Sequence, residues 1–460
     1  MPANSATHFR TRLALDRPTF QYVSRTVLCL GALARVVAAQ SAPLADSVTK
    51  TATIQTQLGV MATGVLTRAS PAYNHRTFTE VQLIQPVLMA SLRLRSVTVL
   101  GSLNAEGYTL ERGELNAGIW GEGYVDRRHP HTLVHEAMVT WQSPTLLRGR
   151  PSAPASLAVS LAAGRGFVPF GSDDPMMRPL EKYPVNHHHS QILERIQVIG
   201  AARVTRGQQA ITLEGTRFNG DEPAGAFHGP RWSRFGDSWS IRATGQLRRG
   251  LELSASEAGI VSPELQQGGA FDHRQRHASL RFARPNGRGD ARYILAEIAR
   301  TDEIANGKTA FQYHSALFEA EYGWRGAAAA LRWERTDRGE QTRLADPFRA
   351  PLGHADFQNL GVTQWRVVTV ALKAPPLHLV HRSFRTNVGP FVEVARAVPT
   401  PRNRPTVFEP ADFYGASKLW SVSVGMRVHA GAMRARMGRY GVLSDPPSGA
   451  DMNHGMHHDK

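Results

Sequence analysis

The stretch WSVSVGMRV, residues 420–428, alternates apolar side chains with small or polar ones throughout its length. The same alternation recurs in IRATGQLR at 241–248, in LELS at 251–254 and in LRWER at 331–335. Successive side chains of a β-strand point to opposite faces, so each stretch predicts a strand with one apolar face and one polar face. The pattern runs from about residue 50 to residue 440 without a long helical segment, and it predicts an all-β protein.

Turn signals separate these strands. Short connections are expected at 249–250, 285–287 and 323–326, and longer polar links at 219–237, 259–274 and 335–360. Short turns at one end and long loops at the other are typical of outer-membrane barrels, which have an even number of strands in bacteria. We therefore predict a single closed antiparallel transmembrane β-barrel of about 16 strands, within a range of about 14 to 18. A soluble sandwich would show the same stripes.

Aromatic residues near the strand ends also favour the barrel, because such residues form girdles at the two membrane interfaces. The candidates for these girdles are Trp120, Trp141, Trp239, Tyr322, Trp324, Trp333, Trp365, Tyr414 and Trp420.

The N-terminus predicts export. Arginines at 10, 12, 17 and 25 precede an apolar stretch at 27–39 that ends in the small residues Val37, Ala38 and Ala39. This order is typical of a signal peptide, although a short buried helix is the alternative. We expect a signal peptide at 1–39, a lead-in at 40–50, the barrel at 51–443 and a disordered His/Met-rich tail at 444–460. No later segment has the 18 or more consecutive apolar residues of a membrane helix.

Composition excludes several classes of protein. Cys29 is the only cysteine and lies in the segment expected to be removed, which excludes a disulfide scaffold, a cysteine-zinc site and a thiol enzyme. The chain has 54 Lys and Arg against 38 Asp and Glu, for a formal charge of +16. An exported chain rarely meets nucleic acid, so this excess favours lipid headgroups or anionic solutes as partners.

Charged residues on the polar face would line the lumen, and a proline-rich loop at 164–179 could fold inward as a constriction. In that loop, basic residues would attract anions and acidic residues would repel them. A surface loop with Asp-Pro turn chemistry is the alternative. Glu252, Glu334 and Arg427 would share the polar face. The pore and constriction candidates are Arg165, Asp173, Asp174, Arg178, Arg242, Arg248, Arg281 and Arg332.

Three groups of histidines could bind a transition metal, since imidazole, carboxylate and thioether are ligands of copper and zinc. They lie at 129–135, at 187–189 and in the tail. The alternative for residues 129–135 is a set of polar residues paired with each other. The alternative for residues 187–189 is a solvated loop, and that for the tail is a disordered end without a function. The candidate ligands are His129, His131, His135, His187, His189, Met452, His454, Met456, His457 and His458.

The chain resembles a group of exported β-barrel proteins without an established activity. The resemblance covers about residues 115–300 and rests on DRRHPH at 126–131, EGTRFNGDEP at 214–223 and DSWS at 237–240. It implies a barrel in the outer membrane. In this group we associate an acidic residue with the position of Thr132, and its absence here weakens a metal or acid–base role. The stretch that ends in PFG at 169–171 also resembles part of the phosphate- and sugar-selective porins.

We therefore predict a porin-like outer-membrane barrel that passes small solutes or ions passively, with a mild anion preference and no cofactor. One alternative is a barrel that binds copper or zinc for uptake or resistance. A second is a hydrolase at the barrel rim, in which Asp126 and either His131 or His135 activate water. A soluble periplasmic β-protein is a third. Outer-membrane lipid and, during biogenesis, the barrel-assembly machinery are the expected partners. Self-association is left open.

Overall fold

The computed structural model describes residues 54–70, 77–109, 131–148, 155–223, 225–229, 231–265, 267–284, 292–341, 359–381, 384–402, 408–434 and 436–444. Almost all of them belong to one compact unit, Lys50–His381 with Arg385–Lys460. The expected signal peptide and lead-in, and the expected tail beyond Ser444, lie outside the described residues.

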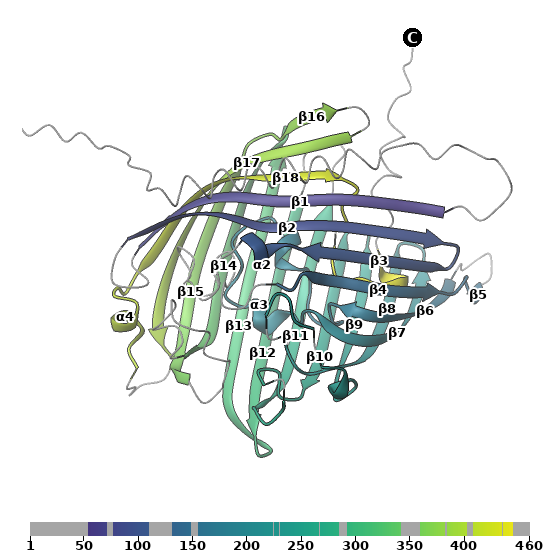
Figure 1. The fold of residues 1–460 in the computed structure, drawn as a ribbon, viewed down its shortest axis with the longest axis horizontal. Helices are drawn as coiled ribbons and strands as arrows, with labels where there is room; N and C mark the ends of the chain where they lie inside the picture. The colour runs from purple at the N-terminus through teal and green to yellow at the C-terminus, as the bar shows by residue number, and fades with distance from the viewer. Residues whose placement is uncertain are drawn as a thin grey trace, which may run out of the picture. The chain divides into compact units, whose positions relative to one another are not determined.

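A closed ring of antiparallel strands forms this unit (Figure 1). Each strand pairs with the next along the chain, and β1 pairs with both β2 and β18, which closes the ring. Two short strands, β5 (Leu147–Arg148) and β16 (Leu377–His381), are bypassed, because β4 pairs with β6 and β15 pairs with β17. The predicted closed barrel of sixteen strands is confirmed.

The sixteen strands are β1 (Ile54–Ala69), β2 (Phe78–Leu94), β3 (Val97–Asn104), β4 (Val134–Gln142), β6 (Ala155–Gly166), β7 (Arg195–Arg206), β8 (Gln209–Phe218), β9 (Ser238–Arg248), β10 (Leu251–Ile260), β11 (Asp272–Arg284), β12 (Arg292–Ala305), β13 (Lys308–Trp324), β14 (Ala327–Gln341), β15 (Asn359–Lys373), β17 (Phe384–Pro401) and β18 (Leu419–Gly431). The described helices are short: α2 (Glu106–Thr109), α3 (His187–Ser190), α4 (Pro410–Phe413) and the 3₁₀ turns η1 (Pro175–Met177), η2 (Trp232–Arg234) and η5 (Gly441–Leu443).

The wall of the barrel has apolar residues outside and polar residues inside. In β8, Ile211 and Leu213 are 68% and 60% exposed, whereas their neighbours Thr212 and Glu214 are each 1% exposed. A soluble protein buries its apolar side chains, so this arrangement is inverted. The period-two pattern in the sequence produces it directly, because alternate residues of a strand face opposite sides of the wall.

Short hairpins connect the strands at one end. The turn between β9 and β10 contains Gly250 at φ +80°, and the turn between β13 and β14 contains Arg325 and Gly326 at φ +52° and +85°. These two turns were predicted, whereas the one predicted at 285–287 lies outside the described residues. Long connections lie at the other end, as expected, except that β12 and β13 are joined there by a tight turn with Asn306 and Gly307 at φ +51° and +73°. The loop predicted from residue 335 was too long, because β14 continues to Gln341.

Some aromatic residues expected in the girdles lie elsewhere. Trp141, Tyr322, Trp324, Trp333 and Trp420 are exposed on the outer wall, as predicted. Trp120 lies outside the described residues, and Trp239 is only partly exposed.

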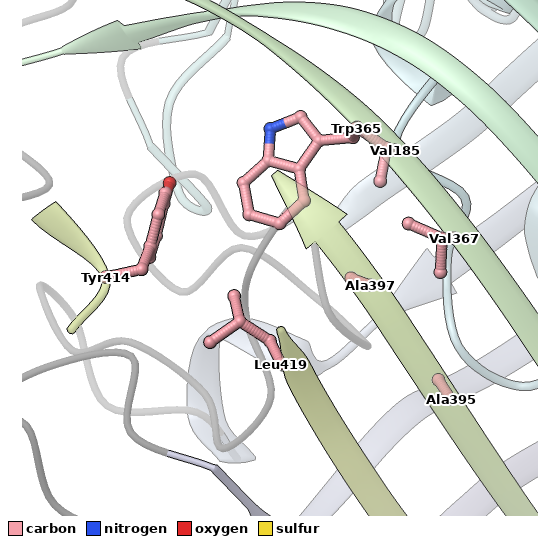
Figure 2. Close-up of a cluster of buried hydrophobic side chains, with 7 residues drawn as sticks. All are labelled: Val185, Trp365, Val367, Ala395, Ala397, Tyr414 and Leu419. Carbon is pink, nitrogen blue, oxygen red and sulfur yellow. The ribbon is translucent and has the colours of Figure 1, made fainter. Parts of the chain in front are cut away.

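Trp365 and Tyr414 contradict the girdle prediction, because both are buried in a core cluster with Leu419 (Figure 2). Trp365 Nε1 and the Tyr414 hydroxyl donate to the two carboxylate oxygens of Glu340, at 3.0 and 2.7 Å. A buried Trp or Tyr needs such a partner for its polar atom, and an inward-facing carboxylate supplies it here. None of the described helices is long and apolar enough to span a membrane.

Candidate functional site

The loop between β6 and β7, Phe167–Glu194, is the longest described segment without strands, and nearly all of it is buried. Pro169, Pro175, Pro179 and Pro184 lack the backbone N–H that a strand ladder requires, so this segment leaves the sheet. Its residues contact the polar faces of strands from β10 to β18, which places it inside the barrel. We call this segment the lumenal loop. The sequence left two alternatives open for residues 164–179, and the structure has the inward fold rather than the surface loop.

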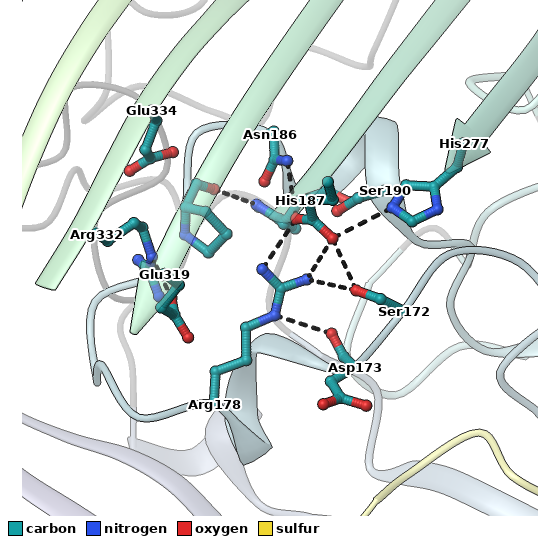
Figure 3. A network of polar contacts seen from close by, with 12 residues as sticks. Ser172, Asp173, Arg178, Asn186, His187, Ser190, His277, Glu319, Arg332 and Glu334 are labelled. Atoms are coloured by element: carbon teal, nitrogen blue, oxygen red, sulfur yellow. Dashed lines mark hydrogen bonds and ion pairs between the residues drawn. The ribbon is translucent and has the colours of Figure 1, made fainter. Parts of the chain in front are cut away.

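Arg178 and Glu297 form the centre of the contacts between the lumenal loop and the wall. Figure 3 shows Arg178 with Ser172, Asn186 and His277 around it. Arg178 Nη1 and Nη2 donate to the two carboxylate oxygens of Glu297 on β12, at 3.0 and 3.3 Å. Arg178 Nε donates to the carbonyl of Asp173 at 2.9 Å. Ser172, Asn186 and His277 complete the hydrogen bonds of the Glu297 carboxylate.

The backbone of the lumenal loop is held by carboxylates that project from the wall. The amides of Glu181 and Lys182 donate to Glu393 at 3.0 and 3.1 Å, and the amide of Val185 donates to Glu334 at 2.8 Å. A loop taken out of water needs partners for its amides, and these glutamates supply them. They therefore act as docking points for the loop as well as lumenal charges.

The residues after β18 also fold into the lumen, which was not predicted. We call Ala432–Leu443 the C-terminal segment. Arg436 donates to Asp173 and to Glu252, both at 2.7 Å, and the Tyr440 hydroxyl donates to Glu136 at 2.8 Å. Gly438, at φ +67°, packs so closely on Phe167 that a Cβ atom would lie 2.8 Å from the Cβ of Phe167. The sequence signal was the short cluster of arginines at 434–439, which follows the last alternating strand.

The predicted constriction residues are inside the barrel, with one exception. Arg178, Arg242 and Arg332 are buried and paired with Glu297, Glu214 and Glu319, respectively. Arg248 is exposed at the end of its hairpin instead.

The two aspartates of the predicted constriction are engaged rather than free. Asp174 accepts from the Met176 amide at 2.7 Å and caps a turn. Asp173 is paired with Arg281 and Arg436. Burial alone would raise the pKa of Asp173, but the guanidinium groups of Arg281 and Arg436 lower it well below its usual range.

Two histidines of the predicted metal group form separate pairs with carboxylates. His131 Nδ1 lies 2.8 Å from Glu106, and His135 Nδ1 lies 2.6 Å from Glu194. Burial alone would lower the pKa of His131, but the Glu106 carboxylate outweighs it and raises the pKa to about 9. Thr132 donates through its hydroxyl to Glu194 at 2.7 Å. An acidic group therefore does lie at Thr132, but a distant part of the chain supplies it.

The described histidines at 187–189 do not join this pair in a metal site. Tyr183 lies between His131 and His187, with ring centroids 6.0 and 5.4 Å away. His189 binds the Thr301 hydroxyl and the Asp337 carbonyl. Among the described residues, no group of three or more His, Cys, Asp or Glu side chains could hold a metal ion. Asp126, His129 and the tail candidates, Met452, His454, Met456, His457 and His458, lie outside the described residues.

No family model matches the chain, and no curated protein matches it. The chain is similar to the solved structure of an anion-selective porin from Comamonas acidovorans, with 8% identity over 82% of this chain and 100% of that one, at a TM-score of 0.46. It is also similar to the outer membrane channel DcaP of Acinetobacter baumannii, with 8% identity over 84% and 100% of the two chains, at a TM-score of 0.43. The strand pairing within this chain is the basis on which the barrel fold is assigned.

Proposed function

We propose that this protein is a porin-like barrel of the outer membrane that passes small solutes or ions passively. The observation that carries the proposal is the inverted wall. Ile211, Leu213 and Ile298 are at least 60% exposed outside, whereas Glu214 and Glu297 are buried on the inner face of the same strands. A wide apolar outer surface needs lipid to cover it, and a closed sheet leaves no unpaired edge in the membrane.

The route for solutes is narrowed by two segments that meet inside the barrel. The lumenal loop enters from the end with the long loops. The C-terminal segment follows Gly431, the last residue of β18, which lies opposite Gly59 on β1. Arg436 joins the two segments through Asp173, and the Tyr440 hydroxyl accepts from the Phe167 amide at 3.0 Å. A barrel of this strand number leaves an aqueous channel when it is empty, so these two segments set the width of the route.

Single-channel recording in a planar lipid bilayer tests the proposal. We expect small, stable conductance steps from the purified protein, because the lumen is filled in part. The variant Arg436→Gln removes the ion pair between the two segments, and we expect a larger conductance from it. Arg249→Gln is the matched control, since it removes the same charge from an exposed hairpin position. Insertion into the bilayer without conductance in wild type and in Arg436→Gln would overturn the channel function.

Location and partners follow from the same proposal. Fractionation should recover the full chain with the outer membrane, and contact with the barrel-assembly machinery stays a prediction. Recovery in the soluble periplasmic fraction would instead favour the soluble β-protein. The mild anion preference is also part of the proposal, and the sign of the reversal potential in a salt gradient measures it.

A further inference from the structure

A cluster of charged side chains lies where the lumenal loop and the C-terminal segment meet. We call it the Asp173 cluster. Asp173 is paired with Arg281 and Arg436, Arg436 is also paired with Glu252, and Arg242 makes two hydrogen bonds to Glu214, at 2.6 and 2.9 Å. Its members are Asp173, Glu214, Glu252, Arg242, Arg281, Arg436 and Arg439.

Arg439 is the member of this cluster that has no carboxylate partner among the described residues. Its side chain is 2% exposed, and its Nη2 donates to the Ser172 carbonyl at 3.3 Å. Its Nε and Nη1 have no hydrogen-bond partner in the described part of the chain. The cluster thus contains four guanidinium groups and three carboxylates, so one positive charge is in excess.

The pairs that surround the cluster do not cancel this excess. Arg434 is paired with Glu136 at 2.8 Å, and Arg178 is paired with Glu297 at 3.0 Å, so each of these pairs is neutral in sum. A buried charge without a counter-ion costs several kcal/mol, as an order of magnitude. Burial and the nearby Arg242 and Arg436 lower the pKa of Arg439 well below its usual range. Glu214 and Glu252 act in the opposite direction, but they do not outweigh burial and the two arginines.

We infer that Arg439 binds a small anion, such as an inorganic oxyanion or the carboxylate of a small solute, at the junction of the lumenal loop and the C-terminal segment. The free Nε and Nη1 donors supply the hydrogen bonds, and Arg242 and Arg436 add positive potential. The inference rests on the proposed channel function and deepens it, since it names small anions as the class of solute that binds where the two segments narrow the lumen. It also locates the anion preference at one residue, because the other arginines of the cluster are engaged with carboxylates.

Thermal unfolding of the detergent-solubilised full chain tests binding without any need for conductance. With inorganic phosphate as the probe, we expect the melting temperature of the wild type to rise by about 2 °C or more as phosphate is added. Arg439→Gln should not respond. In phosphate-free zwitterionic buffer this variant should be at least as stable as the wild type, because the substitution removes an uncompensated charge.

Two further variants keep the test decisive. Arg439→Lys retains the charge and should retain part of the phosphate response, whereas Arg249→Gln removes an exposed charge and should respond as the wild type does. An equal response in wild type and Arg439→Gln would mean that phosphate binds elsewhere, and would overturn the site. So would a phosphate-free Arg439→Gln protein that unfolds well below the wild type, because that would show a structural role for the residue.

Reversal potentials separate failure of the site from failure of the channel. If the wild type conducts, we expect Arg439→Gln to lose chloride preference relative to both the wild type and Arg249→Gln. Conduction with unchanged selectivity in Arg439→Gln would overturn the site and leave the channel function standing. A phosphate response in solution without any conductance would support the site and overturn the channel function.

Discussion

Two neighbouring residues of β12 show the difference between the two faces of the barrel wall. Glu297 is 2% exposed and binds Arg178, Ser172, Asn186 and His277, whereas Ile298 is 62% exposed and points away from the lumen. The inner face is stable because segments that enter the lumen complete its hydrogen bonds and ion pairs. The outer face requires no specific partner, only an apolar solvent. Hydrogen bonds and ion pairs therefore stabilise the inner face of the wall, and an apolar solvent stabilises the outer face.

The largest effect that we expect comes from breaking the inner face at Glu297. Glu297→Ala should lower the free energy of unfolding by about 3–5 kcal/mol, because it leaves the buried Arg178 guanidinium without its carboxylate. Denaturant unfolding in detergent or lipid measures the change. Ile298→Ala, one residue along, is the control, and it should cost far less because its side chain is already exposed. Similar costs for the two substitutions would contradict the distinction between the faces.

The outer face can be tested by adding a charge to it. Leu213→Arg should cost about 2–4 kcal/mol in a lipid bilayer, because Leu213 is 60% exposed near the middle of β8. Refolding into phospholipid vesicles under a urea gradient measures this cost. Leu213→Ala controls for the loss of the side chain itself. A negligible cost of the arginine would mean that water covers this face, and would contradict the membrane location.

The ion pair between His131 and Glu106 predicts that the stability of the protein depends on pH. The folded pKa of His131, about 9, lies above its ordinary value of 6.5, so the stabilisation is fully present below pH 6.5 and is lost as the pH rises through 9. A charge-assisted hydrogen bond of this kind contributes about 1.5–3 kcal/mol. Unfolding free energies measured across this window should decrease for the wild type. The slope should shrink in His131→Asn, and an unchanged slope would rule out this pair as its source.

The smallest effect concerns the junction between the C-terminal segment and the wall. Tyr440→Phe removes the hydrogen bonds to Glu136 and from the Phe167 amide, and should cost about 1–2 kcal/mol. Because the segment would be less well held, the conductance of this variant should also fluctuate more than that of the wild type. Tyr322→Phe on the exposed outer wall is the matched control and should change neither quantity. Equal effects at the two tyrosines would mean that the junction does not hold the segment.

Period-two alternation predicted the fold correctly because it reflects a local rule. Residues 241–248 and 420–428 form β9 and β18 as expected, and Arg242, Arg332 and Glu334 lie on the polar face assigned to them. The prolines and the paired aspartates of residues 169–179 likewise indicated a segment that leaves the sheet. These features depend on neighbours in the sequence, so they can be recognised without a structure.

The partners of these residues could not be predicted in the same way. Glu194 binds His135 across 59 positions in the sequence, and Tyr440 binds Glu136 across 304. No local rule links residues so far apart. Trp365 was assigned to a girdle because its strand pattern did not show that Glu340 on the neighbouring strand would supply a partner for its indole N–H.

The sequence by itself determined the wall: the strand type, the approximate strand number, the polar and apolar faces, and the ends that carry short turns and long loops. The tertiary structure alone decided the contents of the lumen. It showed that the C-terminal segment folds back, that most lumenal arginines are paired, and that Arg439 lacks a carboxylate among the described residues. The physical reason is that alternation is a property of each strand, whereas charge pairing depends on which strands closure of the ring brings together.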